Sequence, residues 1–158
     1  MSKEHSIAGI LLPLQQRPLL LPVACIAEVL GYHRPVEHKR GTDWILGDIR
    51  WRGLQLPLIS FELFNQGRFT PFSVNNRIAV MHRTTSDSSD TMPFYAMVIQ
   101  GTPRPLTLKN TELKRSSEAS GPAEKGRAML RETPVTLPDL ALIEQTLEDL
   151  VCPQAITH

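Results

Sequence analysis

The segment at residues 44–64, WILGDIRWRGLQLPLISFELF, constrains the fold of this chain more than any other part of its 158 residues. An apolar run ends in RWRG at residues 50–53, and leucines then alternate with Gln55 and Pro57. Alternation with a period of two is typical of a strand with one buried face. We therefore predict two strands joined by a tight turn and followed by a short helix. Gly47 and Gly53 are the expected structural glycines of this hairpin, with Gly53 at a position of positive φ.

The turn itself is the first candidate binding site. Arg50, Trp51 and Arg52 stand together at its tip, and solvated turns rarely carry a large aromatic side chain without a function. Arg52 can pair with the carboxylate of Glu28 and fix a rigid exposed geometry. The alternative is that Trp51 closes the end of a small barrel while Arg52 only holds the turn. Residue type alone does not decide between these two interpretations.

Two helices are expected outside that segment. The sequence VACIAEVL at residues 23–30 follows Pro22 and places its apolar residues on one helical face, with Glu28 off that face. A second amphipathic helix is expected at residues 139–151, with Asp139 as its N-cap. The acidic residues expected on its solvated face are Glu144, Glu148 and Asp149.

The remaining segments predict short strands separated by many turns. Strands are expected at residues 7–14, 19–21, 45–49, 54–58, 76–83, 93–100, 106–108, 128–130 and 134–137. The polar segments at residues 84–91 and 116–125 are expected to be loops, the first of them mobile, and the basic run at 38–40 a solvated loop. Short strands with frequent turns favour small β-barrels over one large sheet.

Composition and charge exclude several classes of function. A net charge of +1 argues against a general nucleic-acid binder, which is usually strongly basic. No apolar stretch reaches the roughly 18 residues of a membrane span, and the N-terminus does not have the pattern of a signal peptide. The two cysteines, Cys25 and Cys152, are far apart, so free thiols in a reducing cytoplasm are the simplest expectation.

Motifs for catalysis or cofactor binding are absent from the sequence. It contains no GxSxG, Walker or GxGxxG pattern. Cys25, His33 and His38 do not make up the three or four closely spaced ligands of a zinc site. We therefore expect no metal, no cofactor and no enzymatic activity.

Two blocks of the sequence resemble the CheW-like family, the coupling proteins of bacterial chemosensory arrays. The first block is LPVACIAEVLGY at residues 21–32, and the second consists of Trp44, Gly47, Arg52, Gly53, Pro57, Ile59 and Phe64. The resemblance runs from about residue 7 to residue 67. NRIAVMHR and FYAMVIQG, farther along, resemble the second-half strands of the family more loosely.

The resemblance implies a mostly β fold, with two SH3-like β-barrel subdomains and short helices. The expected organisation is a single CheW-like domain over residues 1–158, with subdomains at 7–67 and 75–137 and a C-terminal helix at 139–151. The implied role is that of an adaptor without catalytic activity. It would link the cytoplasmic tips of chemoreceptors to the regulatory domain of a CheA-type histidine kinase, without nucleic acid and without membrane insertion.

The same resemblance implies a set of partner-binding residues. Glu28 and Arg52 match the glutamate and arginine that the family carries near the groove between its subdomains, where receptor tips bind. Ile26, Val29 and Gly47 occupy matching contact or packing positions.

Some residues depart from the family pattern. The family often has NLRG at the turn where this chain has RWRG, so Arg50 and Trp51 are the residues that differ. Ser60 replaces the acidic residue that usually follows the next strand. These departures suggest a specialised partner, as in a chemosensory system that controls type IV pili. The alternatives are a sensor that binds a small molecule or peptide in a cleft between the barrels, and a hydrolase with an unusual site.

Overall fold

The computed structural model describes residues 6–38, 41–67, 75–85 and 92–151. Within these ranges the elements are, in chain order, β1 (Ser6–Leu12), β2 (Leu19–Pro22), η1 (Val23–Cys25), β3 (Ile26–Gly31), β4 (Ile45–Trp51), β5 (Leu54–Ile59), α1 (Phe61–Phe64), β6 (Arg77–His82), β7 (Phe94–Ile99), β8 (Arg104–Lys109), η2 (Asn110–Glu112), β9 (Leu113–Arg115), β10 (Glu124–Leu130), β11 (Thr133–Pro138) and α2 (Leu140–Val151).

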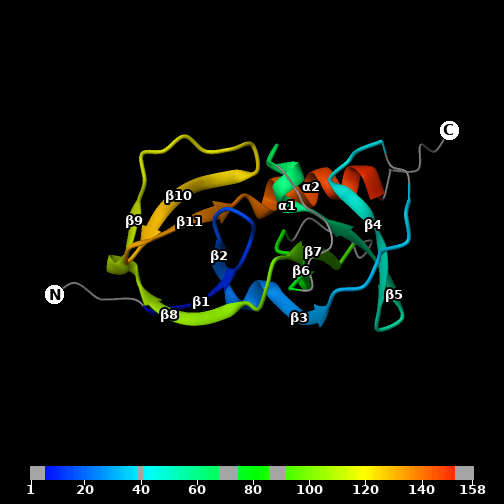
Figure 1. Ribbon diagram of the computed structural model, residues 1–158, viewed down its shortest axis with the longest axis horizontal. Coiled ribbons are helices and arrows are strands. Elements are labelled where there is room, and N and C mark those ends of the chain that lie inside the picture. The colour runs from blue at the N-terminus through cyan, green and yellow to red at the C-terminus, as the bar shows by residue number, and fades with distance from the viewer. Residues whose placement is uncertain (1–5, 39–40, 68–74, 86–91, 152–158) are drawn as a thin grey trace.

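The strands form two sheets, which lie in opposite halves of the molecule (Figure 1). One sheet has six strands in the order β8-β1-β2-β11-β10-β9, and the other has five in the order β3-β6-β7-β5-β4. Neighbouring strands are antiparallel except β2 with β11 and β5 with β7. This arrangement confirms the predicted mostly β class with two SH3-like subdomains.

The two sheets take their strands from the chain in an interleaved way. β1 and β2 pair with β8 and β11, so both ends of the chain build the six-stranded sheet. The five-stranded sheet uses strands from β3 to β7, which lie between those two groups in the sequence. The expected subdomain limits, 7–67 and 75–137, therefore do not coincide with the sheets.

The helix predicted at residues 23–30 is wrong. Val23–Cys25 forms one turn of 3-10 helix, and β3 follows directly. β3 pairs along its length with β6, including Val29 opposite Ala79. The segment contains β-branched residues and is only eight residues long, so its apolar spacing fits a helix and a strand equally well. Hydrogen bonding with β6 decides the outcome.

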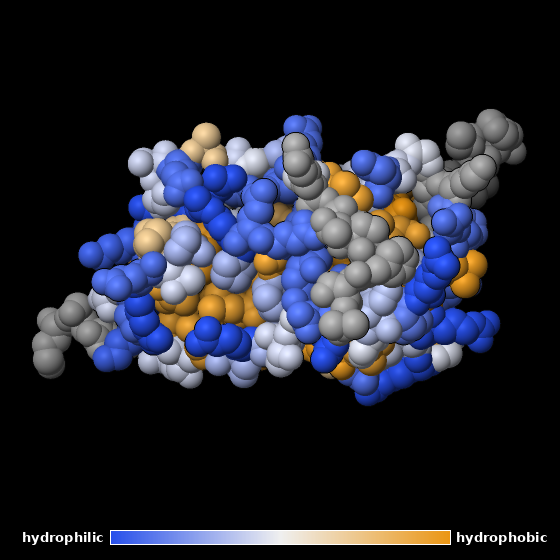
Figure 2. Space-filling view, viewed as in Figure 1, coloured by the Kyte–Doolittle hydropathy of each residue, from blue (hydrophilic) through white to orange (hydrophobic). Residues whose placement is uncertain are grey.

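A core shared by both sheets lies between them. Its buried members include Leu12 and Leu19 from the six-stranded sheet and Ile59 and Met97 from the five-stranded sheet. Each sheet also encloses a smaller apolar cluster of its own. Apolar side chains reach the surface among hydrophilic ones over the half that holds the six-stranded sheet (Figure 2).

Helix α2 runs from the end of β11 toward the half that holds the five-stranded sheet (Figure 1). Ile143 and Leu147 have no exposed surface and belong to the shared core. The Asp139 carboxylate accepts a hydrogen bond from the Leu142 N–H at 3.2 Å, which confirms the predicted N-cap. Because α2 packs on the shared core, it is part of the fold.

The position predicted for Glu144 on the solvated face of α2 is wrong. Its side chain is fully buried, and it accepts hydrogen bonds from the Tyr95 hydroxyl at 2.9 Å and from the Thr84 and Thr85 N–H groups at 3.0 and 2.9 Å. Five donors in all compensate the buried carboxylate, because the hydroxyls of both threonines also point to it. Thr84 and Thr85 begin the loop expected at 84–91, of which residues 86–91 lie outside the described residues.

The other two acidic residues of α2 differ from each other. Glu148 forms an ion pair with Arg83, whose side chain is only 5% exposed, so it is not freely solvated. Asp149 is exposed as predicted. Of the basic run at 38–40, His38 is exposed and residues 39 and 40 lie outside the described residues.

Candidate functional site

The β4–β5 hairpin has the geometry expected from its sequence. Trp51 faces Leu54, and the two residues between them form the turn. Arg52 and Gly53 have φ values of 48° and 78°. Two successive positive φ values give the turn whose twist matches that of the flanking strands. The prediction for Gly53 is confirmed, and Arg52 accepts the same left-handed conformation without being glycine.

Glu28, Trp51 and Arg52 meet at this turn. Glu28 Oε1 accepts a hydrogen bond from Trp51 Nε1 at 3.0 Å and another from Arg52 Nη2 at 2.9 Å. The Arg52 guanidinium lies 4.9 Å from the centroid of the Trp51 ring. The predicted pair of Glu28 and Arg52 is therefore present, although the guanidinium and the carboxylate share one hydrogen bond here and not two.

Side chains of this cluster join the two edges of the five-stranded sheet. Glu28 is in β3 and Trp51 in β4, which are the two edge strands of that sheet. A contact between the two edges requires the sheet to curl as a small barrel does. A second contact to β4 comes from the segment that follows β3, where Val36 and Asp48 exchange backbone hydrogen bonds at 2.9 and 2.8 Å.

Trp51 is not the exposed apolar surface that the sequence suggested. Its side chain is only 8% exposed and belongs to the apolar cluster inside the five-stranded sheet. Its ring packs edge-on against Phe94, with the centroids 4.9 Å apart. The alternative interpretation, that Trp51 closes the end of a barrel, describes this position. The Arg52 side chain, in contrast, is 70% exposed.

The other expected partner-binding residues lie on two edges. Val29 is 37% exposed on the edge strand β3, one residue after Glu28. Ile26, at the start of β3, is half-buried against the shared core. Arg50 is exposed on β4, opposite Gln55. Val29 follows Glu28 on β3, so the two side chains point to opposite faces of the strand, whereas Arg50 lies on the other edge strand, β4.

Gly47 lies within β4 at a bulge and not in a turn. Its φ is 144°, and a Cβ built there would lie 2.4 Å from the Val36 carbonyl oxygen. The absence of a side chain at Gly47 lets β4 approach the segment around Pro35 and Val36.

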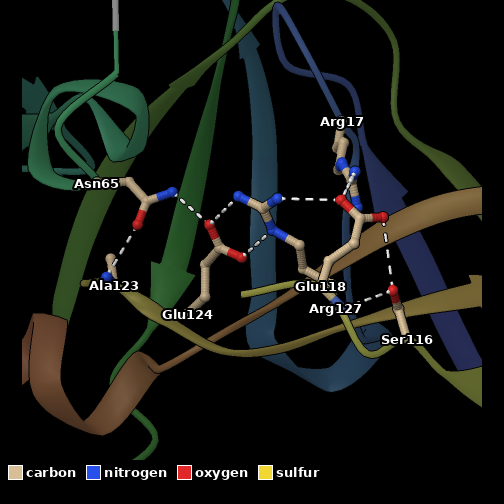
Figure 3. Close-up of polar contacts among 7 residues, drawn as sticks. All are labelled: Arg17, Asn65, Ser116, Glu118, Ala123, Glu124 and Arg127. Carbon is tan, nitrogen blue, oxygen red and sulfur yellow. Dashed lines mark hydrogen bonds and ion pairs between the residues drawn. The ribbon is translucent and has the colours of Figure 1, made fainter. Parts of the chain in front are cut away.

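A second polar cluster was not found from the sequence (Figure 3). Arg127 donates to both Glu124 oxygens, at 2.8 and 3.2 Å, and to Glu118 at 3.3 Å. Arg17 also donates to Glu118, and Asn65 to Glu124 at 2.6 Å. Glu118, Glu124 and Arg127 lie within ten residues of one another, whereas Arg17 and Asn65 come from distant parts of the chain, and no local spacing signals their contact.

The pKa values of the two glutamates in this cluster reflect their partners. The hydrogen bond from Arg17 lowers the pKa of Glu118. Burial acts to raise the pKa of Glu124, but the bonds from Arg127 and Asn65 outweigh it and leave the pKa below its usual range. Both carboxylates are therefore ionised near neutral pH.

The described part of the chain offers little for metal or thiol chemistry. No group of three or more histidine, cysteine, aspartate or glutamate side chains there could hold a metal ion. Cys25 is buried, and burial raises the pKa of its thiol. No helix among the described residues is long and apolar enough to cross a membrane.

A family model for the CheW-like domain matches residues 8–146. The chain belongs to the CheW-like family. The crystal structure of the scaffolding protein TtCheW from Thermoanaerobacter tengcongensis is similar, with a TM-score of 0.70 and 12% sequence identity. The match covers 85% of this chain and 89% of that one, and at this identity it supports the fold alone. A search of curated proteins finds no match to the chain.

Membership of the CheW-like family agrees with the resemblance noted in the first 67 residues and extends it through β11 and into α2.

Proposed function

We propose that this CheW-like domain is a non-catalytic adaptor that couples chemoreceptors to a CheA-type histidine kinase in a bacterial chemosensory array. Its family supports the general role, and the related TtCheW is described as a scaffolding protein. The observation that carries the proposal is the Glu28–Arg52 pair. It holds an exposed cation where side chains join the two edge strands of the five-stranded sheet.

The geometry suggests how such a surface would bind a receptor tip. Glu28 directs the guanidinium of Arg52, and Trp51 supports it from below, so little conformational entropy is lost on binding. Val23 in η1 and Val29 in β3 are 39% and 37% exposed, so they provide apolar area on the segment that carries Glu28. A partner with an acidic group beside an apolar residue would fit this combination of charge and apolar surface.

Arg52→Ala is expected to weaken binding to a chemoreceptor cytoplasmic tip by more than about tenfold, or about 1.4 kcal/mol. The melting temperature should stay nearly unchanged, because an ion pair with an exposed partner contributes little to stability. Binding is measured by calorimetry or by pull-down with the receptor tip and with the CheA regulatory domain.

Lys125→Ala is the matched control, since it removes an exposed cation from the six-stranded sheet. It should leave receptor binding unchanged. If Arg52→Ala strongly lowers the melting temperature, Arg52 has a structural role and the proposed contact is wrong. If the unmodified protein binds neither partner, the adaptor function itself is refuted.

We also propose that the array served by this chain controls type IV pili. Of the two residues that depart from the family turn, only Arg50 is exposed and able to select a partner. Deletion of the gene should abolish pilus-based movement and leave flagellar swimming intact. Loss of swimming alone would contradict this assignment.

A further inference from the structure

A pocket of about 210 Å³ lies at one end of the six-stranded sheet, where β1 ends and β2, β8 and β11 begin. Pairing brings these strand ends together, because Leu12 lies opposite Leu19 and Leu11 lies opposite Arg104. The start of β11 lies beside β2. This cavity is called the strand-end pocket below. Its apolar lining consists of four half-buried residues, Leu11, Pro13, Leu14 and Pro18.

The apolar lining continues into the interior of the six-stranded sheet. Leu11 packs against the buried cluster that this sheet encloses, which includes Leu20 and Leu108. Apolar surface is visible among hydrophilic side chains over this half of the molecule (Figure 2). A ligand with an apolar body would therefore remove apolar surface from water on both sides of the contact.

Two backbone hydrogen bonds hold the prolines of the pocket in place. The Pro13 carbonyl accepts from the Gln100 N–H at 2.8 Å, and the Pro18 carbonyl accepts from the Thr136 N–H at 3.0 Å. The ring of each proline also fixes its own φ. The pocket walls are therefore formed before a ligand arrives, so little conformational entropy is lost on binding.

Among the described residues, Arg104 is the one charged residue that lines the strand-end pocket. As the first residue of β8, it shares a face of that strand with Leu106 and Leu108, which both contact the enclosed apolar cluster. Its side chain is exposed and makes no hydrogen bond or ion pair with another described residue. Arg127 and Arg131 in the same half, in contrast, are paired with glutamates. The guanidinium of Arg104 is therefore accessible to an anion at the edge of an apolar pocket.

We propose that the strand-end pocket binds a small carboxylate with a compact apolar body, of the aromatic acid class. The ring would lie against Leu11, Pro13 and Pro18. The carboxylate would accept from the Arg104 guanidinium, whose planar fork matches two carboxylate oxygens. An apolar cavity of about 150 Å³ is enough for benzene. A pocket of about 210 Å³ therefore has room for a ring and the carboxylate attached to it.

An NMR titration of the full-length protein with sodium benzoate tests this proposal. The amide resonances of Leu11, Arg104 and Thr133 should shift saturably, because these residues line the pocket on three different strands. At matched ionic strength, benzyl alcohol supplies the ring without the charge and sodium acetate the charge without the ring. Each should bind at least about tenfold more weakly than benzoate.

Three results of this titration would overturn the proposal. Benzyl alcohol that binds as tightly as benzoate would show that the Arg104 guanidinium makes no contact with the ligand. Acetate that binds as tightly would show that the apolar lining is not used. No saturable shift with benzoate would mean that the pocket holds only water.

Arg104→Gln should weaken benzoate binding by at least about tenfold and leave benzyl alcohol binding unchanged. Arg115→Gln is the matched control, because Arg115 is another exposed arginine of the same sheet, on the edge strand β9, and should have no effect. An equal affinity of the two variants for benzoate would place the ligand elsewhere. None of the lining residues belongs to the Glu28–Arg52 cluster, so this proposal and the receptor-binding proposal can fail separately.

Discussion

Gly47 has no side chain because β4 passes too close to the segment around Val36 to accept one. A Cβ there would lie 2.4 Å from a carbonyl oxygen, and the φ of 144° is unfavourable for other residues. Gly47→Ala should therefore lower the free energy of unfolding by about 2 kcal/mol or more. Gly31→Ala is the control, since nothing lies within 4 Å of its Cβ, and should change it by at most about 0.5 kcal/mol. Urea denaturation measures both, and equal effects would contradict the close approach.

Glu62 predicts a pH dependence of stability with a definite sign. Burial raises its pKa, so the residue stabilises the fold below its unfolded-state pKa, and this contribution is lost as the pH rises through the higher folded-state pKa. Glu62→Gln cannot ionise and should melt at a higher temperature than the unmodified protein at pH 7, with a smaller difference at pH 4.

Glu118→Gln should show the opposite trend. The folded-state pKa of Glu118 is lowered, so its contribution is present above the unfolded-state pKa and is lost as the pH falls through the folded-state value. This variant should be the less stable one at pH 7 and approach the unmodified protein in acid. Melting curves at several pH values measure both variants, and a pH-independent difference would refute the assigned shifts.

At single residues, the sequence allowed the local contacts to be predicted better than the distant ones. Gly53 at positive φ and the pairing of Arg52 with Glu28 followed from turn chemistry and charge. The burial of Glu144 did not, because its donors lie about 50–60 positions away in the chain. An acidic residue on an amphipathic helix is normally solvated, and only the tertiary structure supplies the exception.

At the scale of elements, α2 depends on the core on one face only. Ile143→Ala should lower the free energy of unfolding by about 2–4 kcal/mol, because it leaves a cavity in the shared core. Leu142→Ala, at a neighbouring position that is 42% exposed, should cost at most about 0.5 kcal/mol. Chemical denaturation compares the two. A large loss from Leu142→Ala would show that the outer face of α2 is also covered.

The hairpins were predictable at this scale, whereas β3 was not. β4 and β5 are joined by a turn whose residues require one geometry. The turn residues and the two-residue alternation of apolar side chains therefore predict the same hairpin. β3 has no hairpin partner next to it in sequence; it pairs with β6, about 50 residues later. An eight-residue apolar segment without a local partner fits two periods, and long-range pairing selects one of them.

The whole molecule should unfold in one step. Leu12 and Leu19 from one sheet share a core with Ile59 and Met97 from the other, so neither sheet keeps its buried surface alone. Trp44 reports on this shared core and Trp51 on the cluster inside the five-stranded sheet. Tryptophan fluorescence and far-ultraviolet circular dichroism should give coincident denaturation curves. Two separate midpoints would show that the halves are independent.

The two-sheet class was predictable for the whole chain, but its division was not. Strand lengths and turns indicated small barrels, and they carry no information on which strands pair across 80 or more residues. β1 and β8 are such a pair, with Ile7 opposite Leu108.

The interleaved strand order also determines the order in which strands can pair while the chain emerges from the ribosome, N-terminus first. The strands from β3 to β7 can pair among themselves as soon as residue 99 is out, but β1 and β2 must wait for β8 and β11. Until then the apolar hairpin at residues 6–22 lacks a neighbour on either side. A product that stops early therefore exposes an unpaired apolar hairpin, the kind of surface that chaperones and proteases bind.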